Sequence, residues 1–323
     1  MKTTALGATG LQVSRIAYGT WQLGGGWGSF DENAAIDAIR HARDLGINFF
    51  DTAQAYGFGA SERILGRALR KEITGDRDSV VIATKGGVRP NGGGRDASAA
   101  FLHQGVEESL RALDVDTIDL YQVHWPDAKV PAEETATALQ ELVDAGKIRH
   151  VGVSNYDVAQ MGAFAEIRPV ETLQPPYHLF RRGIEAEILP YTRAHNIGVL
   201  AYSPLASGLL TGHFDENSTF EADDWRSRSS AFTGDALRRN LAVVRRLAEF
   251  AEQRGITVSQ LAIAWVLAQP GVHVAIVGAR SSANIAASAA AADVQLTAED
   301  LARIDELTAD AVPILGASPE GVA

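Results

Sequence analysis

The chain has 323 residues, no cysteine and a formal net charge of −11, from 29 basic and 40 acidic side chains. Without cysteine the chain can form no disulfide, no cysteine-ligated metal site and no thiol nucleophile. A chain with a negative net charge and no run of basic residues does not attract nucleic acid or an anionic membrane, so we expect neither as a binding partner. Residues 1–20 lack the apolar segment of a signal peptide, and no apolar run could span a bilayer, which favours a cytoplasmic protein.

Eight short runs rich in β-branched and aromatic residues predict buried parallel strands, and longer segments with helical periodicity separate them. The predicted strands are Arg15–Tyr18, Asn48–Phe50, Val80–Thr84, Thr117–Val123, His150–Val153, Glu171–Gln174, Gly198–Tyr202 and Val274–Val277. Residues 1–14 precede the first run and are predicted to form a small hairpin that caps one end of the fold.

Capping residues and apolar positions spaced by three or four residues predict the helices between these strands. Helices are expected to begin at or next to Asp31, Ser61, Ser98, Pro131, Asp157, Ile184, Asp235 and Ser282, and another is expected over Thr257–Ala268.

Eight alternating strands and helices predict an α/β fold, for which we consider two architectures. One is a closed (β/α)8 TIM barrel, and the other is a doubly wound sheet with a second domain. No linker or change in composition divides the chain, so we predict a single barrel domain over residues 1–323. The extra length lies in loops after strands 3 and 7, Gly86–Ala97 and Leu205–Gly234, and in the tail after Val312, where we expect substrate specificity to reside.

Chemically useful side chains follow neighbouring strands of the predicted barrel. Asp51 and Tyr56 follow the second strand, Lys85 ends the third, and His124 follows the fourth. Because active sites of such barrels lie at the carboxyl ends of the strands, we expect these four side chains to surround one mouth.

An ammonium group beside a phenol favours the phenolate, and a carboxylate beside the ammonium holds it in place. A neutral imidazole can orient a carbonyl oxygen by a hydrogen bond. Together these groups suit protonation of a carbonyl oxygen as it becomes an alkoxide. None of them donates electrons, so a reduction would need a hydride from a cofactor.

Three segments resemble the motifs of the aldo-keto reductases: Asp51-Thr-Ala-x-Ala-Tyr56-Gly, Ala83-Thr-Lys85-Gly and Gln122-Val-His124-Trp-Pro. The resemblance continues through residues 146–155, Gln174-Pro-Pro-Tyr, residues 201–212 and Ile276-Val-Gly-Ala-Arg280, and spans Gly7 to about Leu307. It is closest to bacterial members that act on aldehydes, ketones, sugars or polyols, and the potassium-channel β subunits share the pattern.

The resemblance implies a role for each matching residue. Tyr56 would be the general acid or base, tuned by Lys85 and Asp51, while His124 orients the substrate carbonyl. Ser154, Asn155 and Gln174 would hold the nicotinamide carboxamide, and Tyr202 would stack on its ring. The pyrophosphate channel would be shaped by Ser203, Pro204, Leu205, Gly208 and Leu209, and the mouth would be lined by Gly19, Thr20 and Trp21. Trp21, Tyr56 and Trp125 are the candidate aromatic residues of the substrate pocket.

The end of the eighth strand predicts a local anion site. Gly278-Ala-Arg280-Ser-Ser282 precedes a helix, whose first N–H groups attract anions, and a guanidinium can clamp a phosphate with two bonds. This favours a cofactor with a 2′-phosphate, hence NADPH, with NADH possible. Relatives often have Gln, and then Glu-Asn, at the adenosine, where this chain has Asn284, Ala287 and Ser288. Arg226, in the long segment after the seventh strand, has two interpretations, a contact with the cofactor or an exposed loop charge, and we favour the exposed charge.

The sequence therefore predicts a metal-free, NADPH-dependent reductase of a small-molecule carbonyl, working in reverse on alcohols or polyols. One alternative is a nicotinamide-binding sensor or interaction subunit with slow turnover. Another is an isomerase or lyase that forms a Schiff base on Lys85. The physiological substrate and the oligomeric state are not fixed by these patterns.

Overall fold

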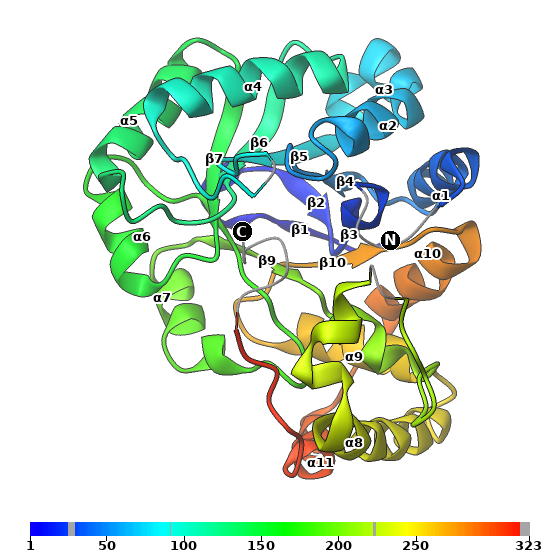
Figure 1. Cartoon of the computed structure of the whole chain (residues 1–323). Helices are drawn as coiled ribbons and strands as arrows, with labels where there is room; N and C mark the ends of the chain where they lie inside the picture. The colour runs from blue at the N-terminus through cyan, green and yellow to red at the C-terminus, as the bar shows by residue number, and fades with distance from the viewer. Residues whose placement is uncertain (25–29, 91, 222–223, 317–323) are drawn as a thin grey trace.

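A computed structural model describes residues 1–24, 30–90, 92–221 and 224–316 of the chain. Eight parallel strands form a closed barrel in the order β10-β3-β4-β5-β6-β7-β8-β9, and Figure 1 shows the helices surrounding them. The barrel strands are β3 (Ile16–Gly19), β4 (Phe49–Asp51), β5 (Val81–Gly86), β6 (Ile118–Val123), β7 (Ile148–Ser154), β8 (Thr172–Gln174), β9 (Gly198–Tyr202) and β10 (Val274–Gly278). The predicted (β/α)8 barrel is confirmed, and the doubly wound sheet is excluded.

The helices of the outer layer begin where local capping dictates. Asp31 accepts hydrogen bonds from the N–H groups of Asn33 and Ala34, and Asp157 and Thr257 each form a reciprocal capping box. The helices are α1 (Glu32–Asp44), α2 (Ala60–Ala68), α3 (Arg70–Gly75), α4 (Ala99–Leu113), α5 (Ala132–Asp144), α6 (Val158–Ala165), α7 (Ile188–Ala194), α8 (Gly234–Glu252), α9 (Val258–Ala268), α10 (Ser282–Ala289) and α11 (Ala298–Thr308).

The start of α7 differs from the prediction. Residues 183–185 form only a 3-10 turn, and the helix begins at Ile188 instead of Ile184. Proline lacks a backbone N–H and is tolerated only in the first turn of a helix. Starting at Ile188 places Pro190 in that first turn, whereas a start at Ile184 would have placed it in the interior. Helices α3 and α11 were not predicted.

Two apolar clusters stabilise the barrel. The larger one fills the layer between strands and helices. The smaller one lies inside the barrel and contains Leu6, Val13, Ala17, Phe49, Val81, Ala83, Leu120, Leu200, Val274 and Ile276. Two of its members, Leu6 and Val13, come from the segment before the first barrel strand, so this segment closes one end of the barrel.

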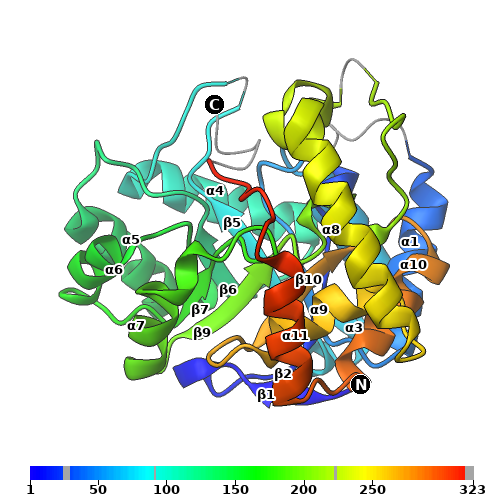
Figure 2. The ribbon, with the colours of Figure 1, turned by 90° about the horizontal axis from the view of Figure 1, so that it is seen from below.

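That closing segment is the predicted hairpin, formed by β1 (Thr3–Ala5) and β2 (Gln12–Ser14), which pair in antiparallel register. Figure 2 shows it beneath the barrel strands, at the end opposite the C-terminal tail. A Cβ on Gly7 would lie 2.3 Å from the backbone nitrogen of Gly198, so only glycine permits this close approach to β9. Any site inside the barrel must therefore open at the other end.

Two long segments lie at that open end, as predicted. Residues 87–98 are folded back by an antiparallel bridge between Val88 and Arg95. The described part of residues 203–233 contains three short 3-10 turns before α8 begins. Parts of the predicted loops and tail, residues 91, 222–223 and 317–323, lie outside the described residues.

The described part of the tail is fixed to two distant elements. The buried side chain of Asn240 on α8 exchanges hydrogen bonds with both backbone groups of Val312, and the Ile314 N–H donates to the Phe180 carbonyl at 2.7 Å. The tail therefore bridges α8 and the segment that follows β8. Nowhere in the described ranges is a helix long and apolar enough to cross a membrane.

Candidate active site

Four polar side chains meet at the open end of the barrel, as the sequence predicts. The Lys85 ammonium donates to Asp51 Oδ2 at 2.7 Å, to the Thr52 carbonyl at 2.8 Å and to Tyr56 Oη at 3.4 Å. Lys85 is completely buried, Asp51 is 2% exposed and Tyr56 is 7% exposed. A buried ammonium and carboxylate are tolerated only when they are paired and hydrogen-bonded, which is the arrangement here.

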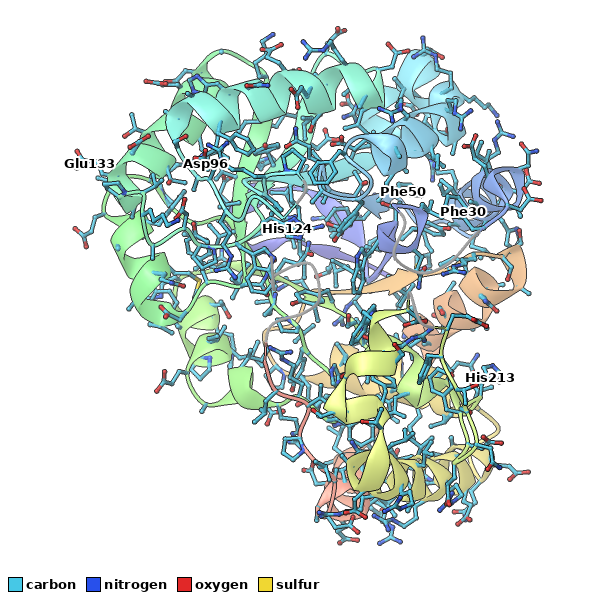
Figure 3. All side chains as sticks on the ribbon, in the orientation of Figure 1. Phe30, Phe50, Asp96, His124, Glu133 and His213 are labelled. Carbon is cyan, nitrogen blue, oxygen red and sulfur yellow. The ribbon has the colours of Figure 1, made fainter. Side chains whose placement is uncertain are left out.

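His124 completes this group from the end of β6. Its ring meets that of Tyr56 edge to face, with centroids 5.7 Å apart, and Figure 3 shows it above the centre of the barrel. Burial, and then the positive charges of Lys85 and Arg95, hold the pKa of His124 well below its ordinary value. The imidazole is therefore neutral at physiological pH and can act as a hydrogen-bond donor without carrying charge.

The loop that carries Tyr56 has a special backbone. Gly57, Phe58 and Gly59 all adopt positive φ angles, of 69°, 46° and 90°. The segment after β3 packs directly on it, because a Cβ on Gly24 would lie 2.4 Å from the carbonyl carbon of Tyr56. A phenylalanine with positive φ is strained, and such strain persists only where the surroundings hold it. The close packing thus fixes the phenol relative to Lys85.

A second set of side chains continues from this group across the next three strands. The Gln174 amide donates to Asp51 Oδ1 at 2.9 Å, and the Ser154 hydroxyl donates to the Gln174 carbonyl at 2.8 Å. The Asn155 amide donates to Ser154 Oγ and to the His124 carbonyl, and accepts from the Tyr202 hydroxyl at 2.9 Å. The residues predicted to hold a nicotinamide are therefore bonded to those predicted to perform catalysis.

These groups open into a cavity of about 550 Å³ that runs from the barrel mouth to α10. The predicted residues that line it are Gly19, Thr20, Trp21, Asp51, Tyr56, His124, Ser154, Asn155, Gln174, Tyr202, Ser203, Pro204, Leu205, Gly208, Gly278, Arg280, Asn284 and Ser288. Residues 203–208 include three non-glycine residues with positive φ. The segment that would line the pyrophosphate channel therefore has an unusual backbone conformation.

Four predicted residues do not line this cavity. Lys85 lies behind Tyr56, and Leu209 is completely buried. Ser282 is the first residue of α10, where the capping hydroxyl instead belongs to Ser281, which accepts from the Asn284 N–H. Trp125 is 7% exposed, with the Arg95 guanidinium 4.8 Å from its ring centroid. The structure thus places Trp125 beneath the loop after β5.

The far end of the cavity carries two arginines, Arg280 and Arg226, and for Arg226 the sequence interpretation favoured an exposed loop charge over a contact with the cofactor. Arg226 lines the cavity with Arg280, its side chain is only 16% exposed, and it forms a bidentate ion pair with Asp224. The prediction of an exposed loop charge is wrong, because Phe214 and Phe220 pack on the guanidinium at 5.6 and 4.6 Å. Burial, and then the charge of Arg226, lowers the pKa of Arg280, so the two cations are close enough to interact.

The donor set fits a phosphorylated nicotinamide dinucleotide. Two amides and a hydroxyl suit a carboxamide, an aromatic ring lies beside them, and two guanidinium groups at the opposite end suit a phosphate. Other lining residues not singled out from the sequence are Gln22, Ser207, Thr211, His213, Thr257 and Ser259. Ser207 and Thr211 lie within the matched segment 201–212, whereas the other four give no sequence signal of their own, because they come from segments that only the fold brings together.

Comparison with known proteins agrees with this geometry. The model of the Aldo/keto reductase family matches residues 15–309. The chain is 45% identical to aldo-keto reductase YhdN of Bacillus subtilis over 304 residues, covering 93% of this chain and 91% of that protein. It is 32% identical to the NADH-specific methylglyoxal reductase of Escherichia coli over 325 residues, covering 95% and 98% of the two chains.

Solved structures show the same similarity. The glycerol dehydrogenase AKR11B4 of Gluconobacter oxydans superposes with a TM-score of 0.88 at 41% identity, covering 98% of both chains. An aldo/keto reductase of Klebsiella pneumoniae, in complex with NADP and acetate, superposes with a TM-score of 0.74 at 34% identity, again covering 98% of both chains. The barrel, the motifs and these matches together show that the chain belongs to the aldo/keto reductase family.

Proposed function

We propose that this protein reduces aldehydes or ketones with NADPH, and oxidises the corresponding alcohols or polyols in reverse, with Tyr56 as the general acid or base. The observation that carries the proposal is the buried contact of the Lys85 ammonium with both Tyr56 Oη and Asp51, beside a neutral His124. An ammonium held next to a phenol stabilises the phenolate that remains after proton donation.

The chain's own groups would move one proton. When bound, the cofactor would supply the hydride that a carbonyl reduction needs. In reduction, the Tyr56 O–H bond would break as its proton passes to the carbonyl oxygen. The phenolate left behind is stabilised by Lys85 and recovers a proton from solvent. In oxidation, the Tyr56 phenolate accepts the hydroxyl proton of the alcohol. His124 would donate a hydrogen bond to the substrate oxygen and orient it toward Tyr56.

The remaining lining residues would bind the cofactor. Ser154, Asn155 and Gln174 would hold the carboxamide, and the Tyr202 ring would lie against the nicotinamide. Arg280 and Arg226 would bind the 2′-phosphate, which supports NADPH as the preferred cofactor. The NADP complex of the Klebsiella relative supports the same preference, while the NADH-specific relative keeps NADH possible.

We propose small, polar substrates for this site. One relative is named a glycerol dehydrogenase and another a methylglyoxal reductase, so the substrate range would include short polyols and dicarbonyls. A Schiff base on Lys85 is a weaker proposal, because its completely buried ammonium already donates to three oxygen atoms.

The test is turnover of NADPH with an activated aldehyde such as a nitrobenzaldehyde, followed by methylglyoxal, and of NADP with glycerol. Tyr56→Phe should lower kcat by about 10²–10⁴-fold, the usual contribution of a general acid, while cofactor binding measured by fluorescence persists. Tyr191→Phe, on α7 away from the cavity, is the matched control. A Tyr56→Phe enzyme with the wild-type rate would refute the mechanism. A single rapid turnover followed by very slow product release would instead favour the sensor.

A further inference from the structure

Gln174 contacts the catalytic group as well as the proposed nicotinamide site. We propose that Gln174 is a positioning residue for the proton donor: it holds Asp51 and, through Asp51, determines how strongly Lys85 stabilises the ionised form of Tyr56. This inference rests on the proposed function, since it assigns a further role within the same site.

The contacts form one continuous path. Gln174 Nε2 donates to Asp51 Oδ1 at 2.9 Å, Lys85 Nζ donates to Asp51 Oδ2 at 2.7 Å, and the same Nζ lies 3.4 Å from Tyr56 Oη. Gln174 is 3% exposed and Asp51 is 2% exposed, so the middle of this path is buried. Hydrogen bonds in such surroundings are electrostatically strong, and a change in one alters its neighbours.

Asp51 explains why a neutral amide matters. Within the described residues, the side-chain hydrogen bonds to its carboxylate are one from Lys85 and one from Gln174, each on a different oxygen. Without the amide N–H, Oδ1 would lose its neutral donor and the negative charge of Asp51 would be less dispersed. The Lys85 ammonium would then be drawn toward Asp51 and would stabilise the Tyr56 phenolate less.

Gln174 also belongs to the proposed cofactor site. Its backbone carbonyl accepts from Ser154, and Ser154 and the His124 carbonyl both accept from the Asn155 amide. One N–H of the Gln174 amide is already engaged by Asp51, which orients the rest of the amide toward the cavity that it lines. A ligand that bonds to this amide therefore alters the environment of Asp51. By linkage, cofactor binding and ionisation of Tyr56 must affect each other.

The decisive variant is Gln174→Met, which keeps the length of the side chain and removes the amide. The measurement is the phenolate absorbance of the cofactor-free protein during an alkaline titration. Subtracting the curve of Tyr56→Phe isolates the signal of Tyr56. Burial raises the pKa of Tyr18, Tyr121 and Tyr156, so these residues ionise at a higher pH than an ordinary tyrosine.

In Gln174→Met the Tyr56 transition should move to higher pH by about half a unit or more, which is within the range that neighbouring groups produce in proteins. The alkaline limb of the kcat profile for reduction should move in the same direction. If the Tyr56 transition coincides with that of the wild type, the inference is refuted. Gln174→Leu gives a second reading should the methionine variant fail to fold, as judged by circular dichroism.

Ser154→Ala is the matched control, because the Ser154 hydroxyl donates to the Gln174 backbone carbonyl, whereas the Gln174 amide donates to Asp51. It should weaken NADPH binding and leave the Tyr56 transition in place. If Gln174→Met weakens NADPH binding but leaves the Tyr56 transition unchanged, Gln174 is a cofactor ligand and not a positioning residue. The proposed function would stand in that case. A Tyr56→Phe enzyme with full turnover would remove the proposed function itself, so the two failures are distinguishable.

Discussion

The two ends of the cavity are built differently. At the barrel mouth, Asp51 and Lys85 lie on strands, and a direct ion pair at 2.7 Å joins their fully or almost fully buried side chains. At the end where we propose that the phosphate binds, Arg226 lies in a short 3-10 turn, is partly exposed, and is paired with Asp224 two residues away. The Asp224 pKa is lowered, against the effect of burial, by hydrogen bonds from Arg226 and by the charges of Arg226 and Arg280.

The difference separates two tasks. Proton transfer needs groups held within a fraction of an ångström, which barrel strands provide. A dinucleotide has to enter and leave, so its phosphate is better held by a segment that adjusts. Substitutions at the mouth should therefore affect turnover and stability together, whereas those at the phosphate end should affect affinity alone.

The largest effect is expected for Lys85→Met. Breaking a buried ion pair leaves Asp51 unpaired, which should cost about 3–5 kcal/mol in the free energy of unfolding. Loss of the ammonium should also lower kcat by about 10²-fold or more. Urea unfolding and steady-state kinetics measure the two effects. The control is Lys147→Met, because its exposed pair with Glu107 at 3.1 Å should contribute less than ~1 kcal/mol. Equal effects of the two variants would contradict the comparison.

Arg280→Ala should act on affinity without lowering kcat. Losing charge-assisted bonds to a 2′-phosphate should raise the Kd for NADPH by about 10–100-fold, and the Kd for NADH should hardly change. Arg226→Ala should have a smaller effect, because its charge is shared with Asp224. Fluorescence titration with both cofactors measures this. Arg303→Ala on α11, which is paired with Glu306 and does not line the cavity, is the control. A parallel loss for NADH would exclude the 2′-phosphate as the ligand.

A third prediction concerns stability behind the mouth. Glu62 is completely buried and accepts from Thr84, the neighbour of Lys85, at 2.7 Å. Burial raises the pKa of Glu62, against the opposing hydrogen bond from Thr84. Glu62 therefore binds its proton more tightly in the folded state than in the unfolded state. As the pH rises above the pKa that Glu62 has in the unfolded chain, the wild type loses stability.

Glu62→Gln removes this titration. The free energy of unfolding of the variant should therefore increase relative to that of the wild type as the pH is raised from 5 to 8. Denaturant unfolding at both pH values measures the trend. Glu133→Gln, at an exposed position on α5 (Figure 3), should show the same difference from the wild type at both pH values. A wild-type advantage that grows with pH would contradict the assignment.

The smallest effect is expected for Ala287→Glu. Ala287 lines the cavity on α10 next to Ser288 and has no polar side-chain atom for a bound adenosine. A carboxylate there can accept one hydrogen bond, so the Kd for NADPH should fall only about two- to ten-fold. Ala283→Glu, on the same helix but not among the lining residues, is the control. An unchanged Kd would show that the adenosine does not reach Ala287.

Much of the site was predictable because its signals are local. A polar residue that directly follows an apolar run ends a strand, and strand ends of a barrel share one rim, which located Asp51, Lys85 and His124. Arg226 gave no such signal. Its burial depends on Phe214 and Phe220, which fold back on it from an irregular segment. Trp125 shows the opposite case, because its strand-end position and the long loop after β5 were predicted, but the packing of that loop on Trp125 was not.

The sequence by itself determined the eight strands, most helix starts and the order of the proposed catalytic side chains, because capping, periodicity and strand ends are encoded within a few neighbouring residues. Only the tertiary structure decided which side chains touch. The Gln174–Asp51 bond joins residues 123 positions apart, and the Asn240–Val312 bonds join residues 72 positions apart. Such contacts arise when the barrel closes, and no local pattern records them.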